Sequence, residues 1–436
     1  MVAQSVAIDV GAIPLSRAGE SPMDGSAVRR HRPDYWLLVL AVFLVVIGLT
    51  VVYAISPALA ATSGGSGANY VSRQMIEIVL SIVAFITTSR IPLRVWQRWQ
   101  MPLLVLAAIG TLVALITPVI PAYPAHRWIR LGGLSLQSVE PLKFALLIWL
   151  GSFLTIRARD GKLADNKATL HPLLVALVII GVVVAGVQSD LGSTGVIVAM
   201  MAAMAFIAGL PLRRVLMIGA IVAIGTVLAV SAIPYRRERL LTYLHPASNC
   251  LTTGYQACQA LIAVGSGGMS GLGLGRSVQA YGYLPEAQND SIFAIYAEKF
   301  GFLGVMLLLG LFVALFARLR LIIERAPDMF SRLVVAGVLA WLSTQMIINV
   351  GAMIGLLPLK GITLPFVSYG GTSVLFVGAA LGLVFQISHY TSFSSRHVRR
   401  GASGRSDGNG QGSNYEDSDD GRRLRRPYHP HLSGRG

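Results

Sequence analysis

Long runs of apolar residues dominate the chain between residues 35 and 390, and short polar segments separate them. The first run, YWLLVLAVFLVVIGLTVVYAI, is long enough to cross a bilayer as a helix, which takes about 20 apolar residues. One such run is compatible with a buried helix of a soluble protein, but a soluble fold does not hide about ten of them. The pattern therefore predicts an all-α polytopic membrane protein. The ten expected spans cover approximately residues 35–57, 73–89, 101–119, 140–156, 172–188, 191–209, 214–233, 291–317, 333–355 and 370–389.

Polar segments flank this membrane domain of residues 35–390. Residues 1–34 are polar and contain Gly, Ser and Pro, and residues 391–436 are rich in Gly, Ser and charge, so both segments are expected to be disordered. The RRLRR sequence of the basic tail is compatible with contact with anionic lipid or with simple solvation. The first apolar run is too long for the core of a cleavable signal peptide, so we expect it to remain as an anchor.

Lysine and arginine residues concentrate in alternate connections between the expected spans. The N-terminal segment and the second, fourth, sixth and eighth connections are rich in them, whereas the short connections in between carry few. Because basic connections stay on the cytoplasmic side, both termini are predicted to be cytoplasmic, which agrees with an even number of spans. The longest connection, about residues 234–290 between spans 7 and 8, is then one large extracytoplasmic loop. Its aromatic, Leu and Ile residues favour an ordered structure.

Composition and charge narrow the classes of protein and of binding partner that fit this chain. Hydrophobic residues make up 54% of the chain and charged residues 13%, about half the charged fraction of a soluble domain. The net charge of +16 is compatible with nucleic-acid binding, but basic residues on the cytoplasmic side explain it better, so no nucleic acid is expected as a partner. The 8 histidines show no metal-ligand spacing. Cys250 and Cys258 both lie in the long loop, where a disulfide and two free thiols fit the spacing equally.

Charged residues at the edges of apolar spans need a specific reason, because such positions are costly in lipid. In RWIRLGGLSLQSVEPLK, which leads into the fourth span, Arg127 and Arg130 precede the helix and Glu140 lies near its positive N-terminal end. Lys143 is expected about one turn inside the membrane. It would either extend back to the interface or form a cationic site for a phosphate group together with the arginines.

Two further segments interrupt the apolar pattern. QSDLGS is a tight turn between spans 5 and 6, in which Asp190 would cap the next helix or serve a site, and capping is the commoner role. GLLPLKGITLPFVSYGGTS contains two prolines and four glycines, which favours a re-entrant or cavity-lining loop over a plain connecting turn. Ser368, Tyr369 and Ser373 would supply its polar lining.

The stretch GYLPEAQNDSIFAIYAEKFG at the end of the long loop starts as loop and ends as helix. Asp290 is compatible with a catalytic carboxylate or, like Asn289, with a cap of the helix that follows. Glu286 would be a binding residue or a solvated loop residue. Two charges about two turns into the helix, Glu298 and Lys299, are difficult to assign to a surface. Together, the charged groups favour an amphiphilic substrate with an anionic head, handled at the outer leaflet by transport or by chemistry.

These motifs, in this order, resemble the SEDS family (shape, elongation, division and sporulation) over roughly residues 34–390. The most specific part is GYQACQALIAVGSGGMSGLGLGRSVQAYGYLPEAQNDSIFAIYAEKFGFLG. Within the family, DYWLLVL, GLGRSVQ and YLPEA are more similar to the division branch (FtsW) than to the elongation branch (RodA). The resemblance implies a ten-helix peptidoglycan glycosyltransferase of the bacterial cytoplasmic membrane. Such enzymes polymerise lipid II on the outer side together with a class B penicillin-binding protein, within the division or elongation machinery.

The resemblance also implies roles for single residues. Asp290 stands at the family's essential acidic position, which favours catalysis over capping, since a carboxylate can accept the proton of a sugar hydroxyl. Arg127, Arg130 and Lys143 are candidates to stabilise the leaving pyrophosphate. A divalent metal, Mg or Mn, is compatible with the same task, although no ligand set is visible. One carboxylate without a partner nucleophile favours single displacement with inversion. The other candidate substrate-binding residues are Glu140, Asp190, Glu286, Ser368 and Tyr369.

The chain departs from the family pattern at several positions. Gln288 and Asn289 replace the usual His-Thr pair before Asp290, Ser291 replaces Phe, and Thr363 replaces Pro. Because the aspartate is kept, we expect a divergent but active member. The rival hypotheses are a flippase for the lipid-linked precursor, whose site would lie nearer the membrane midplane, and a scaffold that only recruits a penicillin-binding protein.

Overall fold

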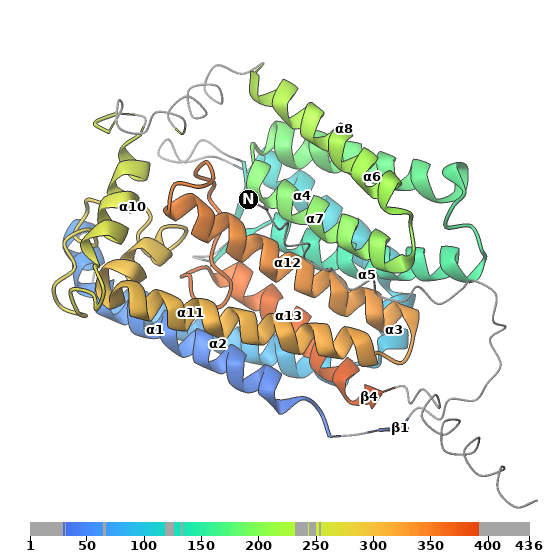
Figure 1. The fold of residues 1–436 in the computed structure, drawn as a ribbon, viewed down its shortest axis with the longest axis horizontal. Coiled ribbons are helices and arrows are strands. Elements are labelled where there is room, and N and C mark those ends of the chain that lie inside the picture. The colour runs from blue at the N-terminus through green and yellow to red at the C-terminus, as the bar shows by residue number, and fades with distance from the viewer. Residues whose placement is uncertain are drawn as a thin grey trace, which may run out of the picture. The chain divides into compact units, whose positions relative to one another are not determined.

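The structure, a computed structural model, describes residues 29–30, 32–63, 67–117, 126–131, 134–231, 243, 250–252 and 254–391 (Figure 1). The chain divides into two compact units, Met1–Phe393 and Ser394–Gly436, and all described residues belong to the first. The expected disorder of residues 1–34 and 391–436 therefore concerns residues that lie almost entirely outside the description.

Helices make up nearly all of the regular structure in the described residues. They are α1 (Tyr35–Ser63), α2 (Gly67–Arg90), α3 (Leu93–Arg98), α4 (Gln100–Ile116), α5 (Val139–Arg159), the π-helical turns η1 (Asn166–Leu170) and η2 (Gly181–Val187) on either side of α6 (His171–Ile180), α7 (Leu191–Ala208), α8 (Leu212–Ser231), α10 (Tyr255–Ser266), α11 (Ile292–Arg325), α12 (Met329–Met353) and α13 (Gly371–Ser388).

Two short antiparallel strand pairs accompany the helices. β1 (Arg29–Arg30) pairs with β4 (Tyr390–Thr391), so the two ends of the membrane domain lie side by side. β2 (Trp128–Leu131) pairs with β3 (Leu134–Gln137), so the connection before the fourth span contains a β-hairpin.

Each of the ten predicted spans coincides with one of these helices, with α6 and η2 together forming the fifth, and the all-α membrane fold is confirmed. Eight helical segments of the described residues are long and apolar enough to cross a membrane. α4 is shorter, and α8 is not among the eight, so the number of ten spans stays a prediction. The helix ends differ from the predicted ones because hydropathy marks the part of a helix that lies in lipid; α11, for example, continues to Arg325.

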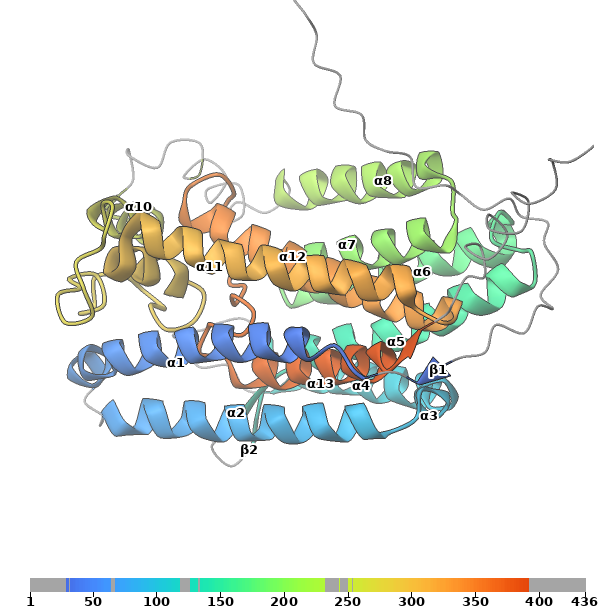
Figure 2. The same ribbon diagram turned by 60° about the horizontal axis from the view of Figure 1, so that its bottom comes forward.

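The interior of the bundle is formed by α5, α7, α12 and α13, which bury more than half of the residues in their most apolar stretches. The corresponding buried share is 11% for α2 and 22% for α11. In Figures 1 and 2, α12 runs through the middle of the bundle and packs against α5, α7 and α11. The apolar side chains that α2 and α11 leave exposed form the kind of surface that contacts lipid.

α11 is interrupted at Gly301, whose backbone angles (φ 62°, ψ −165°) are not helical. The glycine-rich residues 267–273 lie against this break, and the Leu272 N–H donates to the carbonyl of Glu298 at 2.9 Å. An irregular backbone within an apolar helix needs such partners, because lipid offers none. The glycine-rich segment is therefore an ordered part of the fold.

Two charged side chains of α11 hold the same loop. The Glu298 carboxylate accepts from the backbone N–H groups of Val278 at 2.9 Å and Gln279 at 3.2 Å. Lys299 Nζ donates to the carbonyl of Leu274 at 2.6 Å. Both side chains are buried. These charges inside an apolar helix thus have partners within the protein, as buried charges require.

The long loop is also closed by a disulfide. Cys250 and Cys258, with Cα atoms 5.5 Å apart, are bonded, so the disulfide is the alternative that the structure contains. A stable disulfide fits an oxidising compartment outside the cytoplasm. Residues 232–242, 244–249 and 253 of this region lie outside the described residues.

Candidate functional site

Asp290 lies at the end of the long loop, directly before α11. The helix begins at Ile292, and Ser291 occupies the N-cap position without a capping hydrogen bond from its side chain. The N-cap residue is therefore Ser291, rather than Asn289 or Asp290. The contacts around Asp290 show what else lies at this position.

The backbone before Asp290 is held by the irregular segment between α12 and α13. Tyr369 N–H donates to the carbonyl of Gln288 at 2.9 Å, and Ser368 Oγ donates to the carbonyl of Asn289 at 2.6 Å. The loop that was predicted from prolines and glycines is present. Its contacts with the residues before Asp290 make it part of the site rather than a plain connecting turn.

Asn349 of α12 adds a third contact. Its Nδ2 donates to the carbonyl of Asp290 at 2.7 Å and to the carbonyl of Ile362 at 2.7 Å. Within the segment that follows, Ile362, Leu364 and Val367 are buried. This irregular backbone is covered by protein, as irregular backbone within a membrane has to be.

Arg127 reaches the same place from the start of the β2–β3 hairpin. Its Nε donates to the carbonyl of Gln188 at 3.0 Å, and its Nη2 donates to the carbonyl of Ser189 at 2.6 Å. A Cβ atom added to Gly361 would lie 3.8 Å from Nη1 of Arg127 and 3.7 Å from Oδ2 of Asp290. A guanidinium and a carboxylate from distant parts of the chain therefore converge on one glycine.

Glu140 and Lys143 form an ion pair of 2.8 Å in the first turns of α5, and both are buried. Lys143 Nζ also donates to Oε1 of Gln345 at 3.3 Å and lies 4.9 Å from the ring centroid of Trp341. Lys143 does not extend to the interface. Because Glu140 balances the charge of Lys143, Lys143 does not form an open cationic site either.

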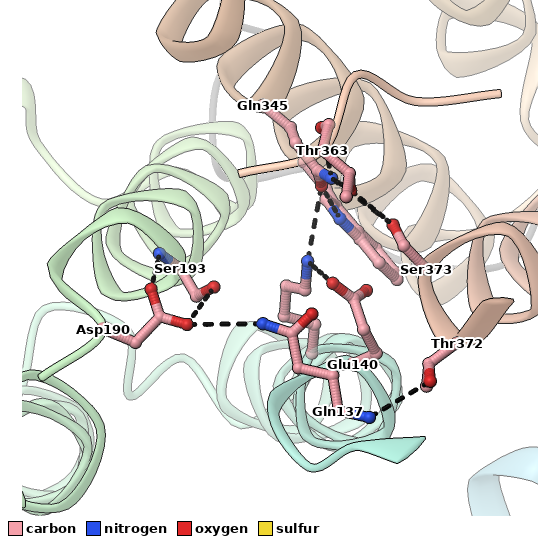
Figure 3. Close-up of polar contacts among 10 residues, drawn as sticks. Gln137, Glu140, Asp190, Ser193, Gln345, Thr363, Thr372 and Ser373 are labelled. Carbon is pink, nitrogen blue, oxygen red and sulfur yellow. Dashed lines mark hydrogen bonds and ion pairs between the residues drawn. The ribbon is translucent and has the colours of Figure 1, made fainter. Parts of the chain in front are cut away.

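Gln345 connects this ion pair to the irregular segment, as Figure 3 shows. Its Nε2 donates to the carbonyl of Thr363 at 2.9 Å, and its Oε1 accepts from Nε1 of Trp341 at 2.8 Å. Thr363 Oγ1 donates to Oγ of Ser373 at 3.1 Å. The network therefore runs from α5 through α12 to the first turn of α13.

Asp190 caps α7, which is the commoner of its two expected roles (Figure 3). Its Oδ1 accepts from the Ser193 N–H at 3.0 Å, and its Oδ2 accepts from the Ser193 hydroxyl at 2.9 Å. Gln137 Nε2 donates to the same carboxylate at 3.4 Å, and the Gln137 N–H donates to Oγ1 of Thr372 at 3.1 Å. Asp190 thus joins the hairpin to the turn that holds Arg127.

Glu286 and Arg130 are two further predicted residues. Glu286 has a left-handed backbone (φ 51°), and its carboxylate accepts from the side-chain amide of Asn289. Arg130 lies in β2, but its side chain lies outside the described residues. The structure brings Asp290 and Arg127 together at Gly361, and Gln345 connects Lys143 and its partner Glu140 to Thr363 in the same irregular segment.

Burial and the nearby Glu77 carboxylate raise the pKa of Tyr369 to about 12, although Arg73 acts in the opposite direction. Its ring packs edge-on against Tyr70, with 6.1 Å between the ring centroids.

The chain's own residues do not form a metal site in the part that the structure describes, where no three His, Cys, Asp or Glu side chains gather. Mg²⁺ is often held by one or two carboxylates and substrate phosphates, so Asp290 alone would need oxygen ligands from the substrate.

Sequence reasoning did not identify Gln345 and Asn349. Their spacing could have indicated them. Trp341, Gln345 and Asn349 follow one another at intervals of four residues and so share one face of an apolar helix. Gln137, the last residue of β3, is an ordinary polar residue that no local pattern distinguishes, and Thr363 is distinguished only by its departure from the family pattern.

Known proteins match this chain over most of its length. The family model FtsW/RodA/SpoVE, described as "Cell cycle protein", matches residues 35–393. A Coxiella burnetii protein named "Probable peptidoglycan glycosyltransferase FtsW" is 36% identical over 362 residues, which cover 82% of this chain and 96% of that protein. Stage V sporulation protein E of Bacillus subtilis is 33% identical over 366 residues, covering 84% of this chain and 99% of that protein.

Solved structures show the same fold. A chain from work on the structural coordination of polymerization and crosslinking by a peptidoglycan synthase complex matches with a TM-score of 0.66 at 27% identity, covering 82% of this chain and 97% of that chain. The rod shape determining protein RodA of Thermus thermophilus matches with a TM-score of 0.59 at 25% identity, covering 82% and 96%. From the family match and these relatives, the chain belongs to the FtsW/RodA/SpoVE family of cell cycle proteins, the SEDS family that its motifs resemble.

Proposed function

We propose that this protein is a peptidoglycan glycosyltransferase that polymerises lipid II into glycan strands during cell division. Relatives that carry the name of this activity match more than 80% of the chain. The division role is favoured over elongation because several of these relatives are named FtsW, in agreement with the DYWLLVL, GLGRSVQ and YLPEA motifs.

The reaction joins a sugar hydroxyl to the anomeric carbon of a second sugar. The 4-hydroxyl oxygen forms the new bond, the bond from the anomeric carbon to undecaprenyl pyrophosphate breaks, and the pyrophosphate leaves with the electron pair. Asp290 accepts the proton of the attacking hydroxyl. Attack from the side opposite the leaving group inverts the anomeric configuration, as in other single displacements on sugars.

Arg127 stabilises the charge that develops on the pyrophosphate. Two backbone carbonyls fix its Nε and Nη2, so the guanidinium is held in place before the substrate arrives. Its Nη1 faces Gly361 together with the Asp290 carboxylate. This convergence of a base and a cation at one point is the observation that carries the proposal.

Lys143 takes a different part from that of Arg127. It is almost fully buried and paired with Glu140, so we assign both residues to positioning the Gln345–Thr363 connection rather than to direct contact with the pyrophosphate. Arg130 remains the candidate for a second cation. Ser368 supports the backbone before Asp290.

The site lies on the outer side of the cytoplasmic membrane in this proposal. The disulfide and the alternation of basic connections both support that orientation. A class B penicillin-binding protein is the expected partner, since a similar chain was solved as part of a peptidoglycan synthase complex. Membrane lipids and other division proteins complete the expected surroundings.

The test is a polymerisation assay with the purified protein, its penicillin-binding partner with the transpeptidase blocked, lipid II and a divalent cation. We expect Asp290→Asn to lower the rate of strand formation by at least about 100-fold, because a positioned general base contributes at least that factor. Partner binding should be unchanged, since the substitution conserves the size of the side chain.

Asp328→Asn is the matched control. Asp328 caps α12 through its Oδ1, which accepts from the Ser331 N–H at 2.9 Å, and asparagine caps helices as well as aspartate does. This control should polymerise like the wild type. Wild-type rates from Asp290→Asn would remove Asp290 from the chemistry, whereas no strands from a verified wild-type complex would favour the flippase or scaffold hypothesis.

A further inference from the structure

Asn349 donates both of its amide hydrogens to backbone carbonyls, one before α11 and one in the segment that follows α12. The acceptors are the carbonyl of Asp290 and the carbonyl of Ile362, each 2.7 Å from Nδ2. The residue is 1% exposed, so neither bond competes with solvent.

The orientation of this amide is set by its partners. A carbonyl oxygen only accepts, so the Asn349 side chain must present its nitrogen to both of them. Its Oδ1 has no hydrogen-bond partner among the described residues. The contribution of Asn349 therefore lies in its two donors.

Three successive carbonyls are held before the catalytic helix, and Asn349 holds the last one. Tyr369 N–H binds the carbonyl of Gln288 and Ser368 Oγ binds that of Asn289. Those two contacts come from the irregular segment itself, whereas Asn349 comes from the rigid helix α12. Only Asn349 among these three also binds Ile362, directly beside Gly361, onto which Asp290 and Arg127 converge.

We propose that Asn349 is the residue that positions Asp290 for catalysis, by tying its backbone and the Gly361–Ile362 segment to α12. This inference rests on the proposed function, in which Asp290 is the base. A general base works only within hydrogen-bond reach of the proton that it accepts, and a displacement of about 1 Å can cost about 100-fold in rate.

Asn349→Asp is the sharpest variant, because it keeps the shape of the side chain. The new carboxylate cannot donate and faces two carbonyl oxygens, so the contact becomes repulsive. Asn349→Ala removes the contact without repulsion. We expect kcat for strand formation to fall about 10- to 100-fold in both variants, with Asn349→Asp the lower, and KM for lipid II to stay within about twofold.

Gln386→Ala is the matched control. The Gln386 amide is also buried, donates from Nε2 to the carbonyl of Ile91 at 2.8 Å, and leaves its Oε1 without a partner among the described residues. Gln386 lies near the C-terminal end of α13, whereas the irregular segment leads into the N-terminal end of this helix. This control should lose thermal stability to a similar degree and keep its kcat.

The outcomes separate the two proposals. An inactive Asp290→Asn together with wild-type kcat in both Asn349 variants overturns the positioning role alone, as does a kcat loss in Gln386→Ala equal to theirs. An active Asp290→Asn overturns the proposed function itself. If neither Asn349 variant folds, Asn349→Ser offers a single hydroxyl hydrogen and cannot hold both carbonyls, so a wild-type kcat there overturns the inference.

Discussion

Two side chains one turn apart, Glu140 and Lys143, carry opposite charges in the interior of the bundle. Their atoms lie 2.8 Å apart, and the side chains are 3% and 2% exposed. The desolvation cost of a buried pair is offset only by close geometry and further hydrogen bonds, and Gln345 supplies one of these to Lys143. Removing one partner would leave the other charge buried without compensation.

Glu140→Gln is therefore expected to destabilise the folded state by about 3–5 kcal/mol, the usual cost of an unpaired buried charge. The double variant Glu140→Gln, Lys143→Met should recover most of that loss, because it removes both charges and keeps the packing volume. Thermal unfolding of the purified protein in detergent measures both effects. Equal melting temperatures for the single variant and the wild type would mean that the pair is not coupled as the geometry implies.

The sequence indicated these residues but not their relations. Asp290 stood out because its surrounding motif is specific, and Lys143 because a charge inside a span is rare. Glu140 and Lys143 are three residues apart on one helix, a spacing that allows an ion pair. The contact of this pair with Gln345, and the role of Asn349 at Asp290, depend on which helices face each other. Tertiary packing decides that, and a single sequence does not encode it locally.

Among the helices, α11 differs from the rest by its break at Gly301. The apolar pattern predicted one continuous helix, because a break changes backbone angles and not hydropathy. The glycine-rich segment that fills the break was visible only as composition. The hydrogen bonds between residues 268–273 and 298–303 show that this segment is the partner of the broken helix.

Gly301→Ala should destabilise the protein by about 2 kcal/mol or more. Its φ and ψ (62° and −165°) are open to glycine alone, and an added Cβ would collide with the backbones of Met269 and Gly271. Gly310→Ala, in the regular part of α11 with open space around its Cβ position, is the control. It should be neutral or slightly stabilising. Thermal unfolding compares the two, and equal effects would contradict a specific requirement at the break.

For the chain as a whole, hydropathy was sufficient to predict the ten apolar helices, because lipid contact imposes one rule on every span. It did not predict the short helix α3 or the loop helix α10. It also did not predict the β2–β3 hairpin, whose four-residue strands depend on contacts with α13. The orientation has a separate basis, since the basic connections alternate with short connections that contain few lysines and arginines and with the long loop, whose length weakens the charge rule. The disulfide in the long loop supports the same orientation from independent chemistry.

This orientation predicts which residues a membrane-impermeant thiol reagent reaches. The two cysteines of the native chain are bonded to each other, so the wild type should give no label in spheroplasts. Tyr281, 54% exposed in the long loop, and Asp160, exposed in the connection after α5, are suitable for single substitutions. Tyr281→Cys should be labelled in intact spheroplasts, whereas Asp160→Cys should be labelled only after permeabilisation. Labelling of the wild type would mean that the thiols are free, and the reverse order for the two variants would place Asp290 on the cytoplasmic side, away from the lipid II that the proposed reaction consumes.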